Sequence, residues 1–312
     1  MNIGLAKVHF VAGKGGVGKT LISQALATIF SRKFNTLWVQ MGEEESDVID
    51  AGVAAIEKLR PNLSHVKIYP DQALYEYLSL KIPGKFVRES FLKQNLLRSL
   101  CSIMPGLSDL TRLGKIWFHA DESSVNGHTI FEKIVVDMPS SGFVERFLSI
   151  ASVVEDVVKI GPLAREAHQI RQYFYNPKHA RLHLVTMLED LVVTESIELA
   201  HRLEQVLQVV MGALFINMVL PPSMASLASV DEGKLEQSSP QIAEIVELFK
   251  QASKEQTEQR ARFLNAKISL PMITVTDAMG KDREPDIVAH IIEDLIADPI
   301  LKDHFATALN PS

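Results

Sequence analysis

The octapeptide Gly13–Thr20, which reads GKGGVGKT, constrains the fold of this chain more than any other stretch. It fits G-x-x-x-x-G-K-[ST], the pattern of a loop whose backbone N–H groups cradle phosphates. An apolar run over 8–12 precedes the loop and predicts a buried strand, and apolar residues recur at helical spacing over 21–30. A strand, a glycine-rich loop and a helix are the context that this motif requires. The sequence therefore predicts a nucleotide-phosphate site near the start of the chain.

Each residue of this loop has a predicted role in binding ATP and Mg²⁺. The glycines let backbone N–H groups turn toward the phosphates, and the following helix adds the positive end of its dipole. We expect Lys19 to reach the β- and γ-phosphates and the Thr20 hydroxyl to hold Mg²⁺. The predicted nucleotide-binding residues are Gly13, Lys14, Gly15, Gly16, Val17, Gly18, Lys19 and Thr20.

Further along the chain, apolar runs that predict strands alternate with helical patterns. The predicted strands cover 36–40, 66–69, 134–137, 181–187, 212–218 and 268–275. This alternation is typical of an α/β fold with a doubly wound, mainly parallel sheet, and we expect a single P-loop domain over 1–312. The region from about 71 to 122 shows helical spacing and no strand run, which predicts a helical insertion. Its apolar side either forms a groove for a hydrophobic partner or packs on the domain.

Two segments that follow predicted strands carry carboxylates suited to a nucleotide site. Asp137 ends a buried-type strand, the pattern of a Walker-type aspartate near Mg²⁺, and Met138–Gly142 suits a loop that moves with the γ-phosphate. Gly142 would allow the backbone to approach that phosphate closely. The acidic stretch 42–47 follows the strand at 36–40, and it either orients the attacking water or starts a helix.

Composition argues against several classes of protein. A formal net charge of −6 does not suit a nucleic-acid partner, and no apolar run approaches the roughly 18 residues of a membrane span. The single cysteine, Cys101, excludes an intramolecular disulfide and a cysteine-only zinc site. His179 and His183 start a predicted strand, where their spacing does not favour a metal site. We expect a cytoplasmic protein without a signal peptide or a transmembrane segment.

Several segments together resemble one family, the arsenite-pump ATPases and their relatives, the guided-entry ATPases that target tail-anchored membrane proteins. Lys14 in KGGVGKT resembles the signature lysine of the deviant Walker A loop. In chain order, PGLSD at 105–109, DMPSSG at 137–142, VTMLEDLVVTES at 185–196 and FINMVLP at 215–221 resemble the family segments P-G-x-x-E, D-T-A-P-T-G, V-T-x-P-E…E-T and N-x-x-x-P. The resemblance covers nearly the whole chain, from residue 8 to about 275.

The resemblance implies roles for further residues. In that family the signature lysine reaches across a dimer interface to the partner's nucleotide, which implies this role for Lys14. The asparagine of N-x-x-x-P reads adenine, which implies a base site at Asn217 and Pro221. The family's first switch places a catalytic aspartate where this chain has Gly42. Glu43, the next residue, is therefore the predicted carboxylate for the attacking water.

Two departures from the family limit what the resemblance implies. The zinc-binding C-x-x-C and the arsenite-binding cysteines are absent, so we expect neither a zinc-bridged dimer nor arsenite pumping. The first predicted function is a slow, dimer-forming ATPase with Lys14, Lys19 and Glu43 as catalytic residues. It would couple the nucleotide state to capture or release of a protein client, such as a hydrophobic segment. The alternative is a nucleotide-binding scaffold with little hydrolysis, acting as one half of a hetero-oligomer. Homodimer and heterodimer both stay open.

Overall fold

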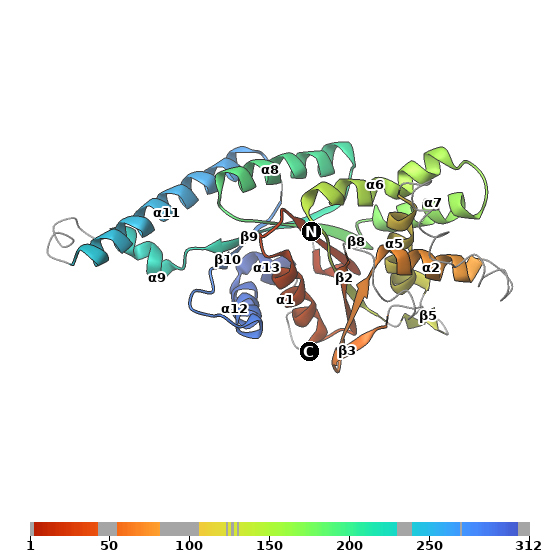
Figure 1. The fold of residues 1–312 in the computed structure, drawn as a ribbon, viewed down its shortest axis with the longest axis horizontal. Helices are drawn as coiled ribbons and strands as arrows, with labels where there is room; N and C mark the ends of the chain where they lie inside the picture. The colour runs from red at the N-terminus through yellow and green to blue at the C-terminus, as the bar shows by residue number, and fades with distance from the viewer. Residues whose placement is uncertain are drawn as a thin grey trace.

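One eight-stranded sheet forms the centre of the molecule, as the computed structural model in Figure 1 shows. Its strands are β1 (Val8–Gly13), β2 (Thr36–Met41), β3 (Glu57–Arg60), β4 (Leu63–Ile68), β7 (Lys133–Asp137), β8 (Ala180–Thr186), β9 (Met211–Val219) and β10 (Met272–Thr276). Their order across the sheet is β10-β9-β8-β1-β7-β2-β4-β3. The β3–β4 pair is antiparallel and the other pairs are parallel. The predicted α/β class with a mainly parallel sheet is confirmed.

Helices cover both faces of this sheet. The structure describes residues 3–42, 55–81, 106–122, 124–125, 128–129, 131–229, 239–268 and 270–304. One face carries α1 (Lys19–Ser31), α12 (Glu284–Ala297) and α13 (Pro299–His304), and the other carries α5 (Leu107–Trp117), α6 (Ser141–Val157), α7 (Pro162–Phe174) and α8 (Asp190–His201). The remaining described elements are η1 (Ile3–Leu5), α2 (Pro70–Lys81), η3 (Phe118–Glu122), β5 (Ser124–Val125), β6 (His128–Thr129), η4 (Arg202–Val206), α9 (Pro222–Ala225), η5 (Ser226–Ser229) and α11 (Pro240–Asn265).

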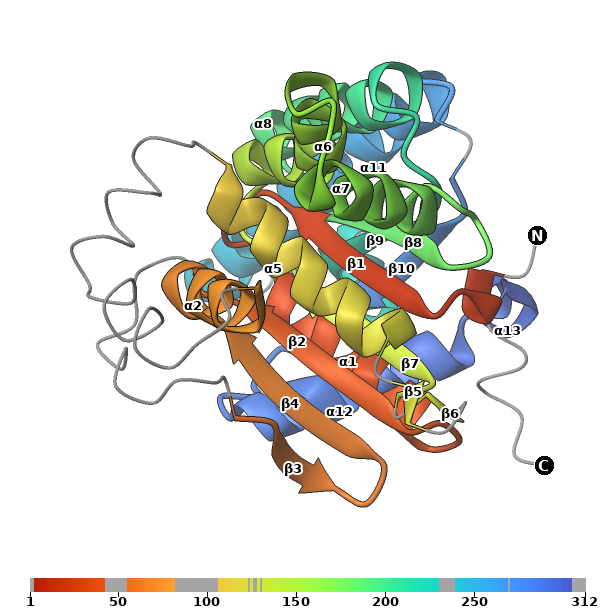
Figure 2. The same cartoon turned by 90° about the vertical axis from the view of Figure 1, so that its right-hand side faces the viewer.

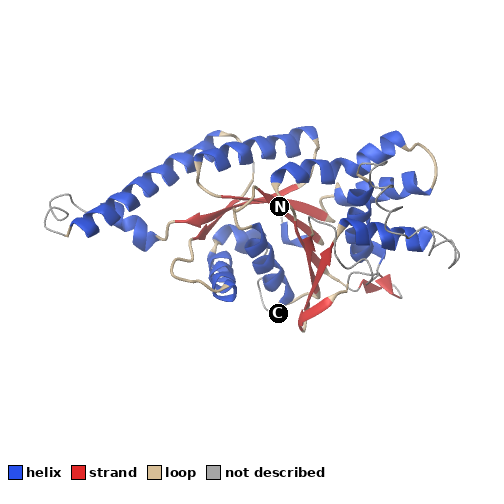
Figure 3. Cartoon of the chain, viewed as in Figure 1, coloured by secondary structure: helices blue, strands red, loops and turns tan. Residues whose placement is uncertain are grey.

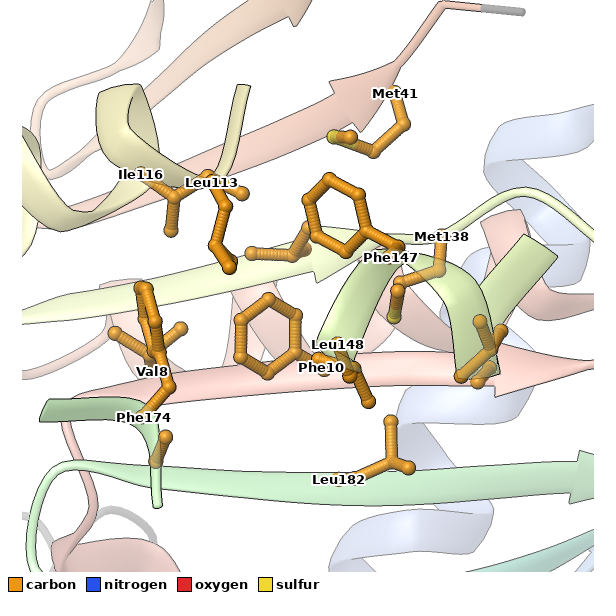
Figure 4. Packing of buried hydrophobic residues seen from close by; sticks show 14 of the residues in the cluster. Val8, Phe10, Met41, Leu113, Ile116, Met138, Phe147, Leu148, Phe174 and Leu182 are labelled. Atoms are coloured by element: carbon orange, nitrogen blue, oxygen red, sulfur yellow. The ribbon is translucent and has the colours of Figure 1, made fainter. Parts of the chain in front are cut away.

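Side chains of each strand alternate between two apolar layers. Phe10 of β1 faces the layer under α5 to α8, where it lies among Leu113 and Phe147 (Figure 4). Val11, its neighbour, faces the opposite layer with Phe30 of α1. Parallel strands buried on both faces read as continuous apolar runs, which is why the sequence predicted most of them.

The described parts of the helical insertion are α2, α5 and η3, and residues 82–105 lie outside the described ranges. Figure 2 shows α5 lying across the sheet, with α2 on one side and α6 and α7 on the other. Leu110, Leu113 and Ile116 of α5 are buried in the layer that contains Phe10. This part of the insertion therefore packs on the sheet. In the described ranges, no helix has the length and apolar character needed to cross a membrane.

Two observed elements differ from the sequence-based expectation. The sequence did not predict β3, whose four residues are all exposed and include three charged ones; such an edge strand lacks the apolar signal of a buried strand. The last strand, expected over 268–275, begins only at Met272, directly after Pro271, which has no N–H to contribute to a ladder. The long helix α11 lies beside α8 and extends beyond the sheet edge (Figure 3).

Candidate functional site

The glycine-rich loop leaves β1 at Gly13 and enters α1 at Lys19, as the sequence predicts. Two of its glycines sit where a side chain would not fit. A Cβ on Gly13 would lie 2.2 Å from the carbonyl oxygen of Val185 on β8. Gly18 has a φ of +90°, in the left-handed region that favours glycine, and its Cβ would lie 2.3 Å from Asn217 Nδ2. The neighbouring strands β8 and β9 thus shape the loop from beneath.

Lys19 is the first residue of α1, and its side chain folds back over the loop. Its Nζ donates a hydrogen bond to the carbonyl oxygen of Lys14 at 2.9 Å. This contact holds the ammonium group over the loop. The first-turn N–H groups of α1 lie next to it and carry the positive end of the helix dipole. The arrangement suits an anion with several negative oxygens, such as a polyphosphate.

Thr20 and Asp137, the two predicted Mg²⁺ ligands, are brought together although 117 residues separate them. The Thr20 hydroxyl donates to Asp137 Oδ2 at 2.7 Å, and Asp137 Oδ1 is buried with no hydrogen-bond partner among the described residues. Burial raises the pKa of Asp137, while the Thr20 hydrogen bond, the Lys19 charge and the nearby Gln40 side chain oppose that rise. A hydroxyl and a carboxylate with an unsatisfied oxygen form a donor set that fits Mg²⁺.

The DMPSSG segment at 137–142, which resembles the family's second switch and is called so below, connects β7 to the start of α6. Met138 N–H donates to the Val11 carbonyl at 3.0 Å, and Ser140 occupies the N-cap position of α6. Gly142 lies in the first turn of that helix, and no described heavy atom lies within 4 Å of the position of its missing Cβ. Packing among the described residues therefore gives no reason for glycine here. Close approach of a bound group to this backbone stays a prediction.

Asn217 lies on β9 beneath the phosphate loop. The residue is 3% exposed, and its side-chain Nδ2 donates to the carbonyl oxygen of Val17 at 2.9 Å. In this structure the amide therefore braces the loop, and recognition of adenine by Asn217 stays a prediction. Pro221, its predicted companion, precedes the short helix α9 and accepts a backbone hydrogen bond from Met224 at 2.9 Å.

Lys14 is paired within its own chain. Its Nζ lies 2.8 Å from Glu195 Oε1 on α8, and both side chains are partly exposed, at 33% and 47%. Glu195 lies in the family-like segment at 185–196, and the sequence predicts no role for it. The pairing depends on β8 lying next to β1, which places the start of α8 beside the loop. No local sequence signal carries that information.

The first switch is described only as far as Gly42, so Glu43, the predicted water-orienting residue, lies outside the described residues. Gly42 N–H donates to the Ile68 carbonyl at 2.9 Å, and Arg112 Nη1 donates to the Gly42 carbonyl at 3.1 Å. A Cβ on Gly42 would lie 2.5 Å from the ring of Tyr69. The aspartate that the family resemblance implies at this position would therefore collide with Tyr69 unless one of them shifts.

Comparison with known proteins shows which family this chain resembles. A family model described as anion-transporting ATPase matches residues 6–169, which contain the loop, both switch segments and α5. The ATPase BagA of Mycobacterium tuberculosis is 28% identical over 249 residues, covering 75% of this chain and 72% of its own length. The ATPase ASNA1 homolog 2 of Paramecium tetraurelia is 29% identical over 154 residues, covering 47% of this chain and 44% of its own.

A third relative is a protein of Aquifex aeolicus that carries the provisional name arsenical pump-driving ATPase 2. It is 29% identical over 167 residues, which cover 49% of this chain and 54% of its own length. These matches confirm the resemblance drawn from the motifs, at an identity that marks a divergent member. The chain belongs to the anion-transporting ATPase family.

Proposed function

We propose that this protein binds ATP with Mg²⁺ and hydrolyses it slowly, acting as a dimeric switch. The observation that carries the proposal is the Thr20–Asp137 hydrogen bond next to Lys19. It joins the phosphate loop to the second switch through the two residues, Thr20 and Asp137, that would hold Mg²⁺ beside the bound phosphates. Loss of the γ-phosphate would then shift Asp137 and, through residues 138–142, the start of α6.

Catalysis in such a site is positioning and electrostatic stabilisation. The loop N–H groups and Lys19 would hold the transferred phosphoryl group, and Thr20 and Asp137 would hold Mg²⁺. When bound, Mg²⁺ supplies neutralisation of the charge that develops on the phosphate oxygens. Lys14 would act on the nucleotide of a partner protomer, and for that its ammonium must leave Glu195.

The proposed slow rate follows from the first switch. Glu43 is one residue away from the position that the family resemblance gives to the catalytic aspartate. Gly42 itself has no carboxylate, and a side chain there would require the Tyr69 ring to shift. Since a misplacement of about 1 Å in a positioning group can cost about a hundredfold in rate, a displaced carboxylate would leave hydrolysis slow.

The lack of a carboxylate at Gly42 also favours a second candidate function. If Glu43 does not orient water, the protein is a nucleotide-dependent scaffold that binds ATP with little turnover, as one half of a hetero-oligomer. In either case we propose that the nucleotide state controls capture or release of a protein client through the helical insertion. Nothing in the residues of the site supports arsenite pumping, since the cysteines for it are missing from the sequence.

The test combines calorimetric titration with a turnover assay on the purified protein. The wild type should bind ATP·Mg²⁺ and release phosphate slowly, and Lys19→Ala should abolish binding with little loss of fold, since this side chain lies over the loop. Lys254→Ala, a change at a largely exposed lysine on α11, serves as the matched control. If Lys19→Ala binds ATP with wild-type affinity, the loop is not the ATP site. If the wild type binds ATP tightly without turnover, the protein is the nucleotide-binding scaffold.

A further inference from the structure

A buried arginine on α5 reaches the first switch. Arg112 is 4% exposed, and its Nη1 donates to the Gly42 carbonyl at 3.1 Å. Its Nη2 donates to Oδ1 of Asp109, one turn earlier on the same helix. The planar guanidinium holds these two bonds in fixed directions. The side chain therefore connects the backbone at the end of β2 to α5 of the helical insertion.

The same arginine also contacts the helix that follows the second switch. Its guanidinium carbon lies 4.9 Å from the ring centroid of Phe143 and 5.9 Å from that of Phe147, both on α6. From α6, Arg146 Nε donates to Asp109 Oδ2 at 3.1 Å. Phe143 comes directly after Gly142, the last residue of the second switch. Arg112 and Asp109 thus contact elements attached to both switches.

A cavity of about 650 Å³ lies between these elements. Asp109 and Arg112 line it from α5, and Pro139, Ser140 and Phe143 line it from the second switch and α6. The cavity gives the second switch room to move against α5. Losing the Gly42 bond would leave a buried, charged donor without its acceptor, which is costly. A displacement of Gly42 therefore favours a matching displacement of Arg112 and of α5. A displacement of the second switch would act on the same guanidinium through Phe143.

We propose that Arg112 is a positioning residue that holds the first switch for hydrolysis and transmits the nucleotide state to α5. The proposal rests on the ATP site proposed above, and adds to it a defined route from both switches to the helical insertion. Arg112 contacts the backbone at Gly42, and it does not itself need to touch the nucleotide. Its removal should therefore affect turnover and the response of α5 more than affinity for ATP.

The chain offers a direct reporter for α5. It contains two tryptophans, Trp38 on β2 and Trp117 at the end of α5, so a Trp38→Phe background leaves Trp117 as the single fluorophore. The experiment measures the fluorescence change on adding Mg²⁺ and a non-hydrolysable ATP analogue, the Kd of that analogue, and kcat and KM for ATP. Arg112→Gln removes the guanidinium and with it the bonds to Gly42 and Asp109. Arg112→Lys keeps a positive charge beside Asp109, but its single ammonium group cannot replace the planar guanidinium that also reaches Gly42.

The matched control is Lys115→Gln on the same helix. Lys115 Nζ bonds both carboxylate oxygens of Glu76 on α2, at 2.6 and 2.7 Å, so this change loosens α5 without touching a switch. In the Arg112 variants we expect the Trp117 response to be lost and kcat to fall about tenfold or more. The Kd should stay within about twofold, since binding of the ground state is not what the arginine supports. Lys115→Gln should retain both the response and the turnover.

Each contrary result has a defined meaning. A folded Arg112→Lys protein with the parent's kcat and Trp117 response overturns the proposal, as does an equal loss in Lys115→Gln. A parent protein that binds the analogue without any Trp117 response overturns it as well. The parent protein could also bind the analogue and show the Trp117 response without hydrolysing ATP. That result would refute the proposed slow hydrolysis, and the fluorescence of the Arg112 variants would still test whether Arg112 transmits the nucleotide state to α5.

Discussion

The buried pair His9 and His183 predicts how the stability of this protein depends on pH. The backbone N–H of Ala213 donates to His183 Nδ1 at 3.1 Å, so neutral His183 carries its proton on Nε2. That proton is donated to His9 Nδ1 at 3.0 Å, which leaves the His9 proton on Nε2, where it is donated to the Ala6 carbonyl at 3.0 Å. We assign these tautomers from the network, and in them both rings are neutral.

Protonating either ring would place two donors face to face in this chain of bonds. Burial lowers the pKa of His183 to about 3, with a smaller effect from the charge of Arg181. Burial also lowers the pKa of His9 well below 6.5, and the His183 ring and Lys133 act in the same direction. The folded-state pKa values lie below that of an unfolded histidine, so the unfolded state binds more protons as pH falls below about 6.5. Acid therefore destabilises the fold through this pair.

The size of the effect follows from linkage. Lowering the pKa of one histidine from about 6.5 to about 3 costs about 2 kcal/mol of unfolding free energy at about pH 5 relative to neutral pH. His183→Asn removes this titration, and its Oδ1 can still accept the Ala213 N–H. The variant will be less stable at neutral pH, but its loss of stability between neutral pH and about pH 5 should be smaller by about 2 kcal/mol.

Urea unfolding at several pH values, followed by circular dichroism and tryptophan fluorescence, measures this difference. The m-values must agree between the two proteins, because only then does a change in midpoint report stability. Above about pH 7.5 both rings are neutral in both states, so the two curves should run parallel there. The same acid sensitivity in the wild type and in His183→Asn would refute the reasoning, because it would mean that His183 is protonated as easily in the folded state.

Three further predictions concern the loop, the first switch and the sheet. Lys14→Ala should keep ATP binding but lose hydrolysis and nucleotide-dependent association, measured by light scattering with a non-hydrolysable analogue; its exposed bond to Glu195 is worth at most about 1 kcal/mol, so the fold should persist. A strictly monomeric, fully active wild type would contradict this. Glu43→Gln should slow turnover further while calorimetric ATP affinity stays intact, and unchanged turnover would place the water-orienting group elsewhere. Gly212→Ala should destabilise the fold by about 1–3 kcal/mol, because its Cβ would lie 2.5 Å from the His183 ring; a denaturant midpoint equal to that of the wild type would show that the ring can move aside.

Much of the nucleotide site could be predicted from the sequence because its groups are local. The phosphate loop needs consecutive backbone N–H groups and one lysine, and all of these lie within Gly13–Thr20. Asp137 was predictable because it ends a buried strand, and parallel strands bring their carboxyl ends to one edge of the sheet. The sheet itself was predictable because strands buried on both faces are continuous apolar runs.

Strand order and helix packing decided the rest. The order β8-β1-β7 places Glu195 beside Lys14 and His183 beside His9, and no spacing along the chain encodes that order. The contact of Arg112 with Gly42 depends on how α5 lies across the sheet, which apolar periodicity does not specify because it marks only the buried face of a helix. The sequence by itself determined the chemistry of the phosphate loop. Only the tertiary structure decided which distant charged and polar groups act on that loop, since such contacts form between segments that meet only after the core has packed.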